Sequence, residues 1–238
     1  MNKERQYLNS AEEIDLLEDL FEFIIPKFRE AHDIMVSMLD FQHTEEIRIA
    51  DLGCGFGELS KRVLGTFPGA VVFGLDKHPD ILARAAEKMN PDSFQFIPYE
   101  RNLSDPAWFA ELSSLHAVIS SFTLDYLNFE KHEQLIHDSY NLIIPRGRWI
   151  SCEFFRAGDQ RINRVFHDIE VALIQNALKN GQVTNEQIEL LSQSQVLRQD
   201  HYVCQVDQKV EWLKNAGFTN IEIPWRFLNI AVISAVRK

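Results

Sequence analysis

Residues 47–57, with the sequence IRIADLGCGFG, constrain the fold more than any other part of the chain. The stretch begins as an apolar run and ends in three glycines, Gly53, Gly55 and Gly57, each separated by one residue. A helical pattern follows over residues 58–64. This order is typical of the first strand, turn and helix of a doubly wound sheet, whose ligand binds beyond the carboxyl end of the strand. Glycine suits the turn because it adopts conformations that a Cβ disfavours and lets a ligand approach the main chain.

A dinucleotide-binding fingerprint is the competing interpretation, and two acidic residues oppose it. The pattern G-x-G-x-x-G starting at Gly53 requires its third glycine at position 58, where the chain has Glu58. A pyrophosphate is bound by helix-terminal amides and positive charge, whereas Asp51 stands two residues before Gly53. These carboxylates favour a nucleoside ligand without phosphates, especially one that carries cations.

The turn resembles motif I of the class I S-adenosylmethionine-dependent methyltransferases, an acidic residue followed by x-G-x-G-x-G. S-adenosylmethionine, with its sulfonium and ammonium groups, matches the acidic turn. A second apolar run, residues 70–75, ends in Asp76. Such folds place an acid about twenty residues after the glycines, where it accepts from both ribose hydroxyls. The resemblance implies an α/β fold with a Rossmann-like, doubly wound, seven-stranded sheet, and S-adenosylmethionine as the cofactor.

The rest of the predicted cofactor site follows from this resemblance. The family places an acid or an amide after the third strand to accept from the adenine amino group, with an apolar neighbour under the ring. Glu100 and Asn102 both stand in this region, and we favour Asn102 with Leu103 without excluding Glu100. The predicted cofactor-binding residues are Asp51, Gly53, Cys54, Gly55, Gly57, Asp76, Lys77, Glu100, Asn102, Leu103, Ser120 and Ser121.

The acceptor is expected at the end of the fourth predicted strand, residues 115–122, on the same edge as the glycine turn. In the family this end faces the methionine part of the cofactor and the acceptor, which implies binding roles for Phe122, Asp125 and Tyr126. Core packing is the alternative for the two aromatic residues. Arg156, the first of three nearby arginines, is a candidate for binding an acceptor carboxylate or phosphate, and pairing with neighbouring acids is the alternative.

Methyl transfer from this cofactor is an in-line displacement, in which an acceptor oxygen, nitrogen or carbon attacks the methyl group and a neutral thioether leaves. The protein mainly supplies proximity and alignment, and a base only where the acceptor must lose a proton. The candidates for a catalytic base are Glu153, His167, His201 and Tyr202. The chain has neither the acid-and-amide pattern of magnesium-dependent catechol enzymes nor an Asn-Pro-Pro-Tyr-like motif of the nucleic-acid amino methylases.

Composition narrows the class of partner. A hydrophobic content of 45% supports a full core. The formal net charge of −11 opposes a broad nucleic-acid surface. The three cysteines are odd in number and lack metal-ligand spacing, so we expect free thiols and no metal site. With no secretory pattern and no bilayer-spanning apolar run, we expect a cytoplasmic protein that acts on a small molecule, without a nucleic-acid or membrane partner.

We expect a single methyltransferase domain over residues 1–238 with two helical additions. Residues 1–41 predict two helices that form an N-terminal cap, in which Tyr7 and Phe21 are better explained as core than as ligand contacts and His32 is expected on the surface. Residues 155–203 carry two helical stripes separated by Gly181 and predict an insertion that serves as an acceptor lid or a dimer surface.

The remaining elements follow from periodicity and from turn residues. A third strand is expected over residues 94–97, followed by a short helix that contains Trp108 and Phe109. The other predicted elements are helices 80–89, 130–142 and 207–217, a turn at 144–148, a strand at 149–154 and a closing hairpin of strands 218–223 and 227–236.

The back half is also similar to the carboxy-S-adenosylmethionine synthases and their relatives, which act in wobble-uridine modification of transfer RNA. The similarity rests on residues 121–124 with Leu127, residues 216–218 and residues 226–229. Those enzymes need an arginine in the insertion to hold the extra carboxylate, and an ungapped count places that position at about Ser194. Ordinary methyl transfer is therefore the main prediction and the specialised activity, or another role in tRNA modification, the alternative. The insertion of those relatives contributes to a dimer, which implies a homodimer.

Two other classes remain as alternatives. A nicotinamide-dependent oxidoreductase is opposed by Glu58 and by the absence of a Tyr-x-x-x-Lys pattern. A non-catalytic cofactor-binding protein would retain the same glycine turn and Asp76, so the sequence separates it from an enzyme only weakly.

Overall fold

The computed structural model describes residues 20, 23, 25–89, 94–193 and 202–238. The chain divides into two compact units. The larger unit, Glu30–Gly158 with His201–Lys238, holds the sheet, and the smaller unit comprises Met1–Arg29 and Asp159–Asp200. Predictions for Tyr7, Phe21, Ser194 and His201, and for the first N-terminal helix, fall largely or wholly outside the described residues.

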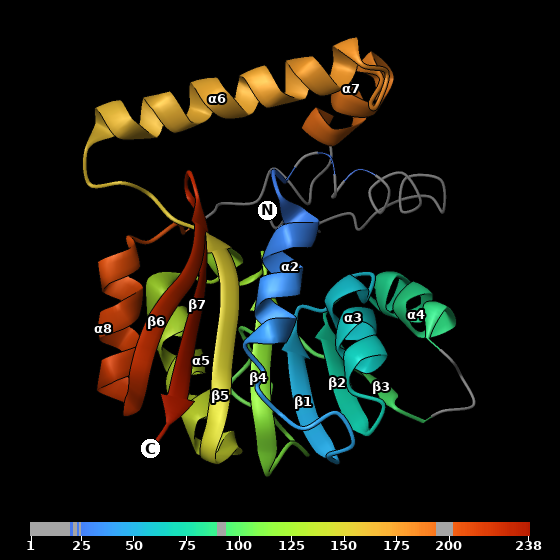
Figure 1. The fold of residues 1–238 in the computed structure, drawn as a ribbon, viewed down its shortest axis with the longest axis vertical. Helices are drawn as coiled ribbons and strands as arrows, with labels where there is room; N and C mark the ends of the chain where they lie inside the picture. Colours follow the sequence, from blue (N-terminus) through green and yellow to red (C-terminus); the bar gives the residue numbers. More distant parts are fainter. Residues whose placement is uncertain (1–19, 21–22, 24, 90–93, 194–201) are drawn as a thin grey trace, which may run out of the picture. The chain divides into compact units, whose positions relative to one another are not determined.

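The larger unit contains a seven-stranded sheet of order β3-β2-β1-β4-β5-β7-β6 (Figure 1). The strands are β1 Ile47–Leu52, β2 Ala70–Asp76, β3 Phe96–Glu100, β4 Leu115–Ser121, β5 Ile143–Phe154, β6 Phe218–Phe227 and β7 Ile230–Arg237. The first five run parallel, and β7 is antiparallel to both of its neighbours. The doubly wound α/β sheet and its reversed last strand are as predicted.

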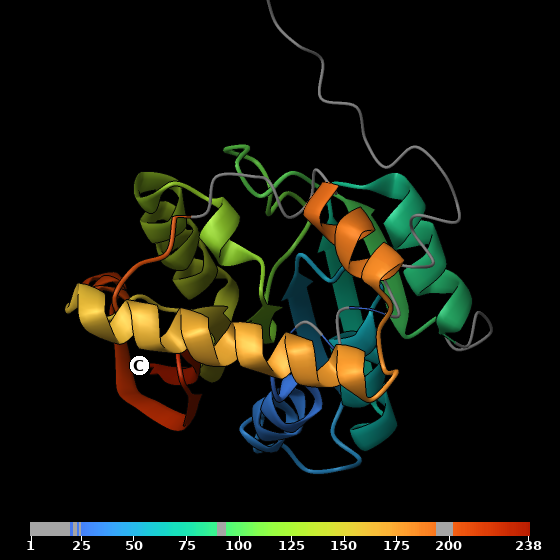
Figure 2. The ribbon, with the colours of Figure 1, turned by 90° about the horizontal axis from the view of Figure 1, so that it is seen from above.

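Helices cover both faces of this sheet. They are α2 Phe28–Ser37, α3 Glu58–Thr66, α4 Pro79–Lys88, α5 Phe129–Leu142 and α8 Val206–Ala216, with a short 3-10 helix at Leu124–Tyr126. Right-handed crossovers place α3 and α4 on one face and α5 and α8 on the other, and Figure 2 shows α3 and α5 on opposite faces. The central strands β1, β2 and β4 are therefore buried on both faces, which explains their continuous apolar sequences.

Local residues fix several helix ends. The side chain of Asn128 accepts from the amide of Lys131 at 2.9 Å and begins α5. Pro79 occupies the first turn of α4, where its missing N–H costs nothing. Gly217 has a φ of 107° and ends α8, as the sequence predicted.

One strand boundary and one helix predicted near β3 are wrong. The strand begins at Phe96, not at Phe94, because Phe94 has a φ of 52° and is 84% exposed. The segment that contains Trp108 and Phe109 consists of turns instead of a helix. Trp108 is nevertheless buried, and its indole N–H donates to Asp138 at 3.2 Å, so tertiary contacts hold the turns in place.

The last two predicted boundaries also shift. The expected turn at 144–148 lies inside β5 as a break in register, where Leu115 pairs with Ile143 and Ala117 with Arg148. The hairpin turns after Phe227 instead of before it, and β6 continues through Pro224. Proline is tolerated there because β6 is an edge strand, and the other edge strand, β3, also contains a proline, Pro98.

The smaller unit contains α6 Gln160–Lys179 and α7 Asn185–Gln193, separated by Gly181 as predicted. The side chain of Asp159 accepts from the amide of Arg161 at 2.8 Å and begins α6. Part of the predicted apolar stripe of α6, including Ile162, Val165 and Ile169, is exposed. No helix within the described ranges is long and apolar enough to cross a membrane.

Candidate functional site

The glycine turn between β1 and α3 has three left-handed residues. Gly53, Gly55 and Gly57 have φ values of 67°, 52° and 80°, which glycine adopts without strain. A Cβ on Gly53 would overlap the side chain of Thr123, and one on Gly57 would lie 2.8 Å from Cε of Met89. A Cβ on Gly55 would meet nothing within 4 Å. The outer glycines thus allow close packing, whereas Gly55 leaves open space at the main chain.

The carboxylate of Asp76, at the end of β2, is tied to this open turn. Its Oδ2 accepts from the amide of Gly55 at 3.1 Å, and its Oδ1 accepts from the amide of His78 at 3.0 Å. The His78 Nδ1 also lies 3.0 Å from Oδ1. Oδ2 has a further lone pair, whereas Oδ1 already lies within hydrogen-bond distance of two nitrogens of His78. The structure therefore places the predicted ribose-binding acid directly beside Gly55, with acceptor capacity left at Oδ2 for a hydroxyl group.

Asp51 lies beneath the turn and is 1% exposed. Its Oδ2 accepts from Ser60 Oγ on α3 at 2.7 Å. Burial raises the pKa of Asp51 to about 7, the hydrogen bond from Ser60 opposes this shift and the nearby Asp76 carboxylate adds to it. The group joins the end of β1 to α3 and contributes negative charge from below the turn.

Cys54 is a spacer within the turn. Its amide donates to the carbonyl of Leu75 at 2.9 Å, and its side chain is buried. Burial raises the pKa of the Cys54 thiol, so it remains neutral. All three cysteines are free and buried, and no group of three His, Cys, Asp or Glu side chains among the described residues is arranged to hold a metal ion.

The two adenine candidates differ in what already binds them. Glu100 is exposed and pairs in register with Asp76 across β2 and β3. Asn102 is exposed, but its Oδ1 accepts from the amide of Ser104 at 3.0 Å. Leu103 is buried and Lys77 is half-buried. The register places Glu100 nearer to the ribose-binding candidate than a residue beyond the strand end.

The end of β4 contains two serines with different partners. The buried Ser120 hydroxyl donates to the carbonyl of Leu52 at 2.8 Å. The Oγ of Ser121 lies 2.7 Å from Nε2 of His32 on α2. His32 is 2% exposed, so the expectation that it lies on the surface is wrong. Its spacing from the buried Phe28 and Met35 was the available signal, since these positions share one face of a helix.

The acceptor candidates gather just beyond β4. Phe122 has a φ of 52°, its amide donates to the carbonyl of Cys152 at 2.8 Å, and its ring lies 5.2 Å from that of Phe154. Asp125 is buried, and its carbonyl accepts from the amide of Tyr202 at 2.6 Å. Burial, together with the Asp125 carboxylate, raises the pKa of the Tyr126 phenol. The structure thus brings Asp125 into contact with Tyr202 and places Phe122 against Phe154.

The other proposed bases and Arg156 have distinct surroundings. Glu153 is 1% exposed, with Oε1 at 2.7 Å from Lys209 Nζ and Oε2 at 3.5 Å from His132 Nε2. This carboxylate is therefore committed to a buried ion pair. His167 is exposed on α6 in the smaller unit. Arg156 is exposed, and its amide donates to the carbonyl of Cys204 at 3.0 Å.

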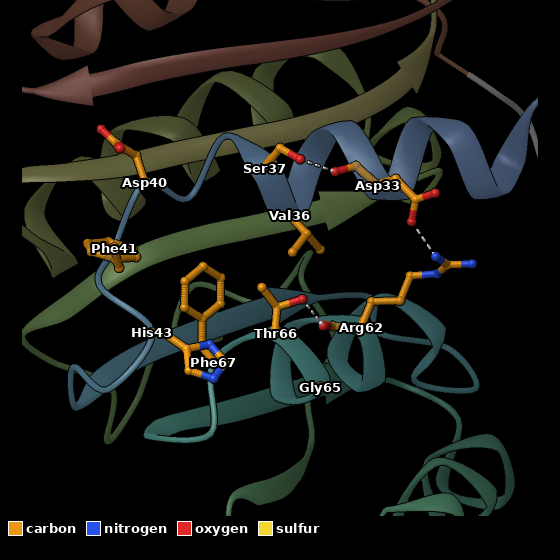
Figure 3. Close-up of a pocket in the computed structure, with 10 residues that line it drawn as sticks. All are labelled: Asp33, Val36, Ser37, Asp40, Phe41, His43, Arg62, Gly65, Thr66 and Phe67. Atoms are coloured by element: carbon orange, nitrogen blue, oxygen red, sulfur yellow. Dashed lines mark hydrogen bonds and ion pairs between the residues drawn. The ribbon is translucent and has the colours of Figure 1, made fainter.

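A pocket of about 650 Å³ is lined by α2, α3 and the segment after α2 (Figure 3). Its lining comprises Asp33, Val36, Ser37, Asp40, Phe41, His43, Arg62, Gly65, Thr66 and Phe67. Arg62 pairs with Asp33, Ser37 donates to the carbonyl of Asp33, and Thr66 donates to that of Arg62. These polar groups bind one another, and none of the three turn glycines lines the pocket.

Comparison with known proteins agrees with the class of protein that the sequence predicted. Residues 49–147 match a family model described as a methyltransferase domain. This match includes the glycine turn, Asp76 and the end of β4. Together with the seven-stranded sheet, this match supports a class I S-adenosylmethionine-dependent methyltransferase, with S-adenosylmethionine as the cofactor.

This chain is also similar in sequence to carboxy-S-adenosyl-L-methionine synthases. The synthase of Nautilia profundicola is 21% identical, over 98% of this chain and 96% of that protein. That of Actinobacillus succinogenes is 27% identical, over 82% of this chain and 78% of that protein. The predicted similarity to this group is confirmed.

Solved structures share the fold. Phosphoethanolamine N-methyltransferase 2 of Haemonchus contortus, in complex with S-adenosyl-L-methionine, has a TM-score of 0.66 and 16% identity, and covers 94% of this chain and 56% of that one. The CurJ carbon methyltransferase has a TM-score of 0.58 and 18% identity, and covers 86% of this chain and 52% of that one. This chain spans little more than half of either protein, and at these identities the likeness concerns the fold alone.

Proposed function

We propose that the protein transfers the methyl group of S-adenosylmethionine to a small-molecule acceptor by in-line displacement. The pairing of the Gly55 amide with the Asp76 carboxylate, beside the open space at Gly55, is the observation that carries this proposal. When bound, the cofactor supplies an electrophilic methyl group on a sulfonium. The protein residues bind and orient the reactants, which is the main contribution required for such a displacement.

We assign the nucleoside to the β1–β2 end of the sheet. Asp76 would accept from the ribose hydroxyls, while the Gly55 main chain would allow close approach. Between the two adenine candidates we favour Glu100, because it pairs in register with Asp76 across β2 and β3. Leu103 and Lys77 would flank the adenine. Asp51, below the turn, would favour the cationic end of the ligand through space.

We assign the acceptor to the β4–β5 end. Phe122 and Tyr126 offer aromatic surface, and Tyr202 is the candidate base with a partly exposed ring. A small molecule fits the net charge of −11 better than a polyanionic nucleic acid does. Arg156 remains a candidate for acceptor binding, and His167 remains a candidate for catalysis. A cytoplasmic location, an N-terminal cap at residues 1–41 and a lid at residues 155–203 also remain predictions.

Calorimetry with S-adenosylmethionine, S-adenosylhomocysteine and NAD tests the cofactor site. We expect micromolar binding of the first two and none of NAD. Gly55→Val should abolish that binding, because its side chain would occupy the open space. Gly181→Val is the matched control: Gly181 also has a positive φ, 66°, and a Cβ added there would likewise meet nothing within 4 Å, so the backbone strain is similar. Equal cofactor binding by both variants would refute the assignment.

A carboxy-S-adenosylmethionine-type activity is the second candidate, because synthases of that name are similar over most of the chain. The ligand that copurifies with the protein distinguishes the two. Denaturation followed by mass spectrometry should release S-adenosylmethionine or S-adenosylhomocysteine if the main proposal holds. A ligand heavier than S-adenosylmethionine by one carboxyl group would favour the second candidate.

We also propose a homodimer that uses residues 155–203. The exposed apolar residues of α6, among them Ile162 and Val165, support this assignment because their burial would be favourable. Light scattering coupled to size-exclusion chromatography should give twice the chain mass, and Val165→Glu should reduce it to one chain. A monomer at all concentrations would refute the dimer without affecting the cofactor site.

A further inference from the structure

His32 connects α2 to the end of β4, on the edge of the sheet where the glycine turn lies. Its Nε2 lies 2.7 Å from Ser121 Oγ, although the two residues are 89 positions apart in sequence. The imidazole is 2% exposed, on the face of α2 that also buries Ala31 and Met35. A buried polar group is costly unless it is hydrogen-bonded, so this contact fixes both side chains.

Ser121 directly follows Ser120, which pairs in register with Leu52, the residue before the glycine turn. It is the last residue of β4, and the chain turns sharply at Phe122, which has a φ of 52°. Thr123 Oγ1 lies 3.1 Å from the carbonyls of both Ser121 and Gly53. One threonine hydroxyl thus bridges the end of β4 and the first glycine of the turn. Ser120 is buried and its hydroxyl donates to the main chain, whereas Ser121 is half-buried.

The imidazole is suited to orienting a hydroxyl instead of removing a proton. Burial, and to a smaller extent the charge of Arg62, lowers the pKa of His32 to about 3. The ring is therefore neutral near pH 7 and has one donor and one acceptor nitrogen. A base this weak contributes little to proton abstraction near neutral pH, but a fixed acceptor or donor at Nε2 determines which way the Ser121 O–H points.

We propose that His32 is a positioning residue of the cofactor site, which orients the Ser121 hydroxyl at the end of β4 for a hydrogen bond to the ligand bound at the glycine turn. The inference rests on the proposed function, since it requires a ligand there. On this proposal, a residue of α2 contributes to cofactor affinity. This helix lies outside residues 49–147, which match the family model.

Calorimetry with S-adenosylhomocysteine tests this role without knowledge of the acceptor. Loss of one oriented hydrogen bond should weaken binding about tenfold in Ser121→Ala and by a similar factor in His32→Leu. The double variant should bind no more weakly than Ser121→Ala alone, because His32 acts through Ser121. His32→Gln, whose amide can reach Ser121, should recover most of the affinity. His32→Asn, which is polar but shorter, should not.

Two controls separate positioning from helix anchoring and from general loss of a serine hydroxyl. Glu30→Ala removes another tie of α2, the 2.8 Å hydrogen bond from Trp225 Nε1, and should leave affinity unchanged. Ser139→Ala removes a buried hydroxyl on α5 that donates to the carbonyl of Leu135, and should also leave affinity unchanged. Thermal unfolding of each variant establishes that it is folded at the temperature of the titration.

The outcomes distinguish failure of the proposed function from failure of the positioning role of His32. If the wild-type protein binds no S-adenosylhomocysteine, the proposed function fails and this inference fails with it. If the wild type binds, multiplicative losses in the double variant, or an equal loss in Glu30→Ala, overturn the positioning role alone. If His32→Leu does not fold, His32→Asn takes its place in the cycle with Ser121→Ala, and the same criteria apply.

Discussion

Asp51 and Glu153 occupy equivalent places in the two halves of the sheet but have opposite electrostatic surroundings. Each is the second-to-last residue of a parallel strand, β1 or β5, and each is 1% exposed. Asp51 accepts from a neutral serine and lies near a second carboxylate, Asp76. Glu153 pairs with the buried ammonium of Lys209 at 2.7 Å. The protein thus supplies a counter-charge at the β5 end, whereas a cationic ligand would supply it at the β1 end.

Removal of the counter-charge at the β5 end should have the largest effect. Lys209→Met leaves Glu153 buried without its ammonium partner, and we expect the free energy of unfolding to fall by about 3–5 kcal/mol. Equilibrium urea denaturation measures the change. Lys131→Met, an exposed position on α5, is the control and should have little effect.

The double variant Glu153→Met with Lys209→Met sharpens this prediction. An apolar pair of similar size often costs little relative to a buried ion pair, so the double variant should recover most of the lost stability. A loss as large as that of Lys209→Met alone would show that packing around the aromatic rings of Trp149 and Trp212, instead of the uncompensated charge, dominates this end.

The free energy of unfolding should depend on pH through Asp51, the buried acid at the end of β1. Because folding raises the pKa of Asp51 from its ordinary value to about 7, the native state binds the proton more tightly than the unfolded state. Its contribution to stability is complete below the ordinary pKa and is lost as the pH rises through about 7. Between pH 5 and pH 8, the wild type should therefore lose about 2–3 kcal/mol of stability relative to Asp51→Asn.

His32 titrates with the opposite sign and must be cancelled in that measurement. Its lowered pKa means that stability is lost as the pH falls from its ordinary value through about 3. The difference between Asp51→Asn and the wild type removes this contribution, because both proteins contain His32. Parallel stability curves for the two proteins between pH 5 and pH 8 would contradict the charge assigned to the β1 end.

Asp76→Ala should have the smallest of the three effects in free energy, and it should affect binding instead of folding. Loss of the acceptor beside Gly55 should weaken S-adenosylhomocysteine at least about tenfold, as measured by calorimetry. Asp207→Ala removes an exposed acid at the start of α8 and is the control. Should both variants bind equally well, the ligand does not use the carboxylate at the end of β2.

The sequence predicted the β1–β2 half better because its signals are local. Apolar runs, the glycine spacing and the acid at position 76 define β1, the turn and β2 within thirty residues or so, and their likeness to a known motif supplied the rest. The positive φ values of the glycines agree with the tight turn that was expected. The same kind of signal predicted Gly217 at the end of α8.

The other half depends on contacts between distant residues, which spacing alone does not reveal. Glu153 meets Lys209 and His132 from two other elements, so its availability as a base was invisible in the sequence. Trp108 is buried in turns because Asp138 holds its indole, whereas its apolar neighbours indicated a helix. His32 had a detectable helical signal, but its partner, Ser121, is a matter of tertiary structure.

The two prolines in the outermost strands have a consequence for the chain during synthesis and at high concentration. Pro98 of β3 and Pro224 of β6 each remove one N–H from an edge of the sheet, and β6 also changes register twice against β7. A strand of another chain can extend a sheet only along a regular row of donors and acceptors. Both margins are therefore poor templates for aggregation, even though the strands between them are among the most apolar segments of the protein.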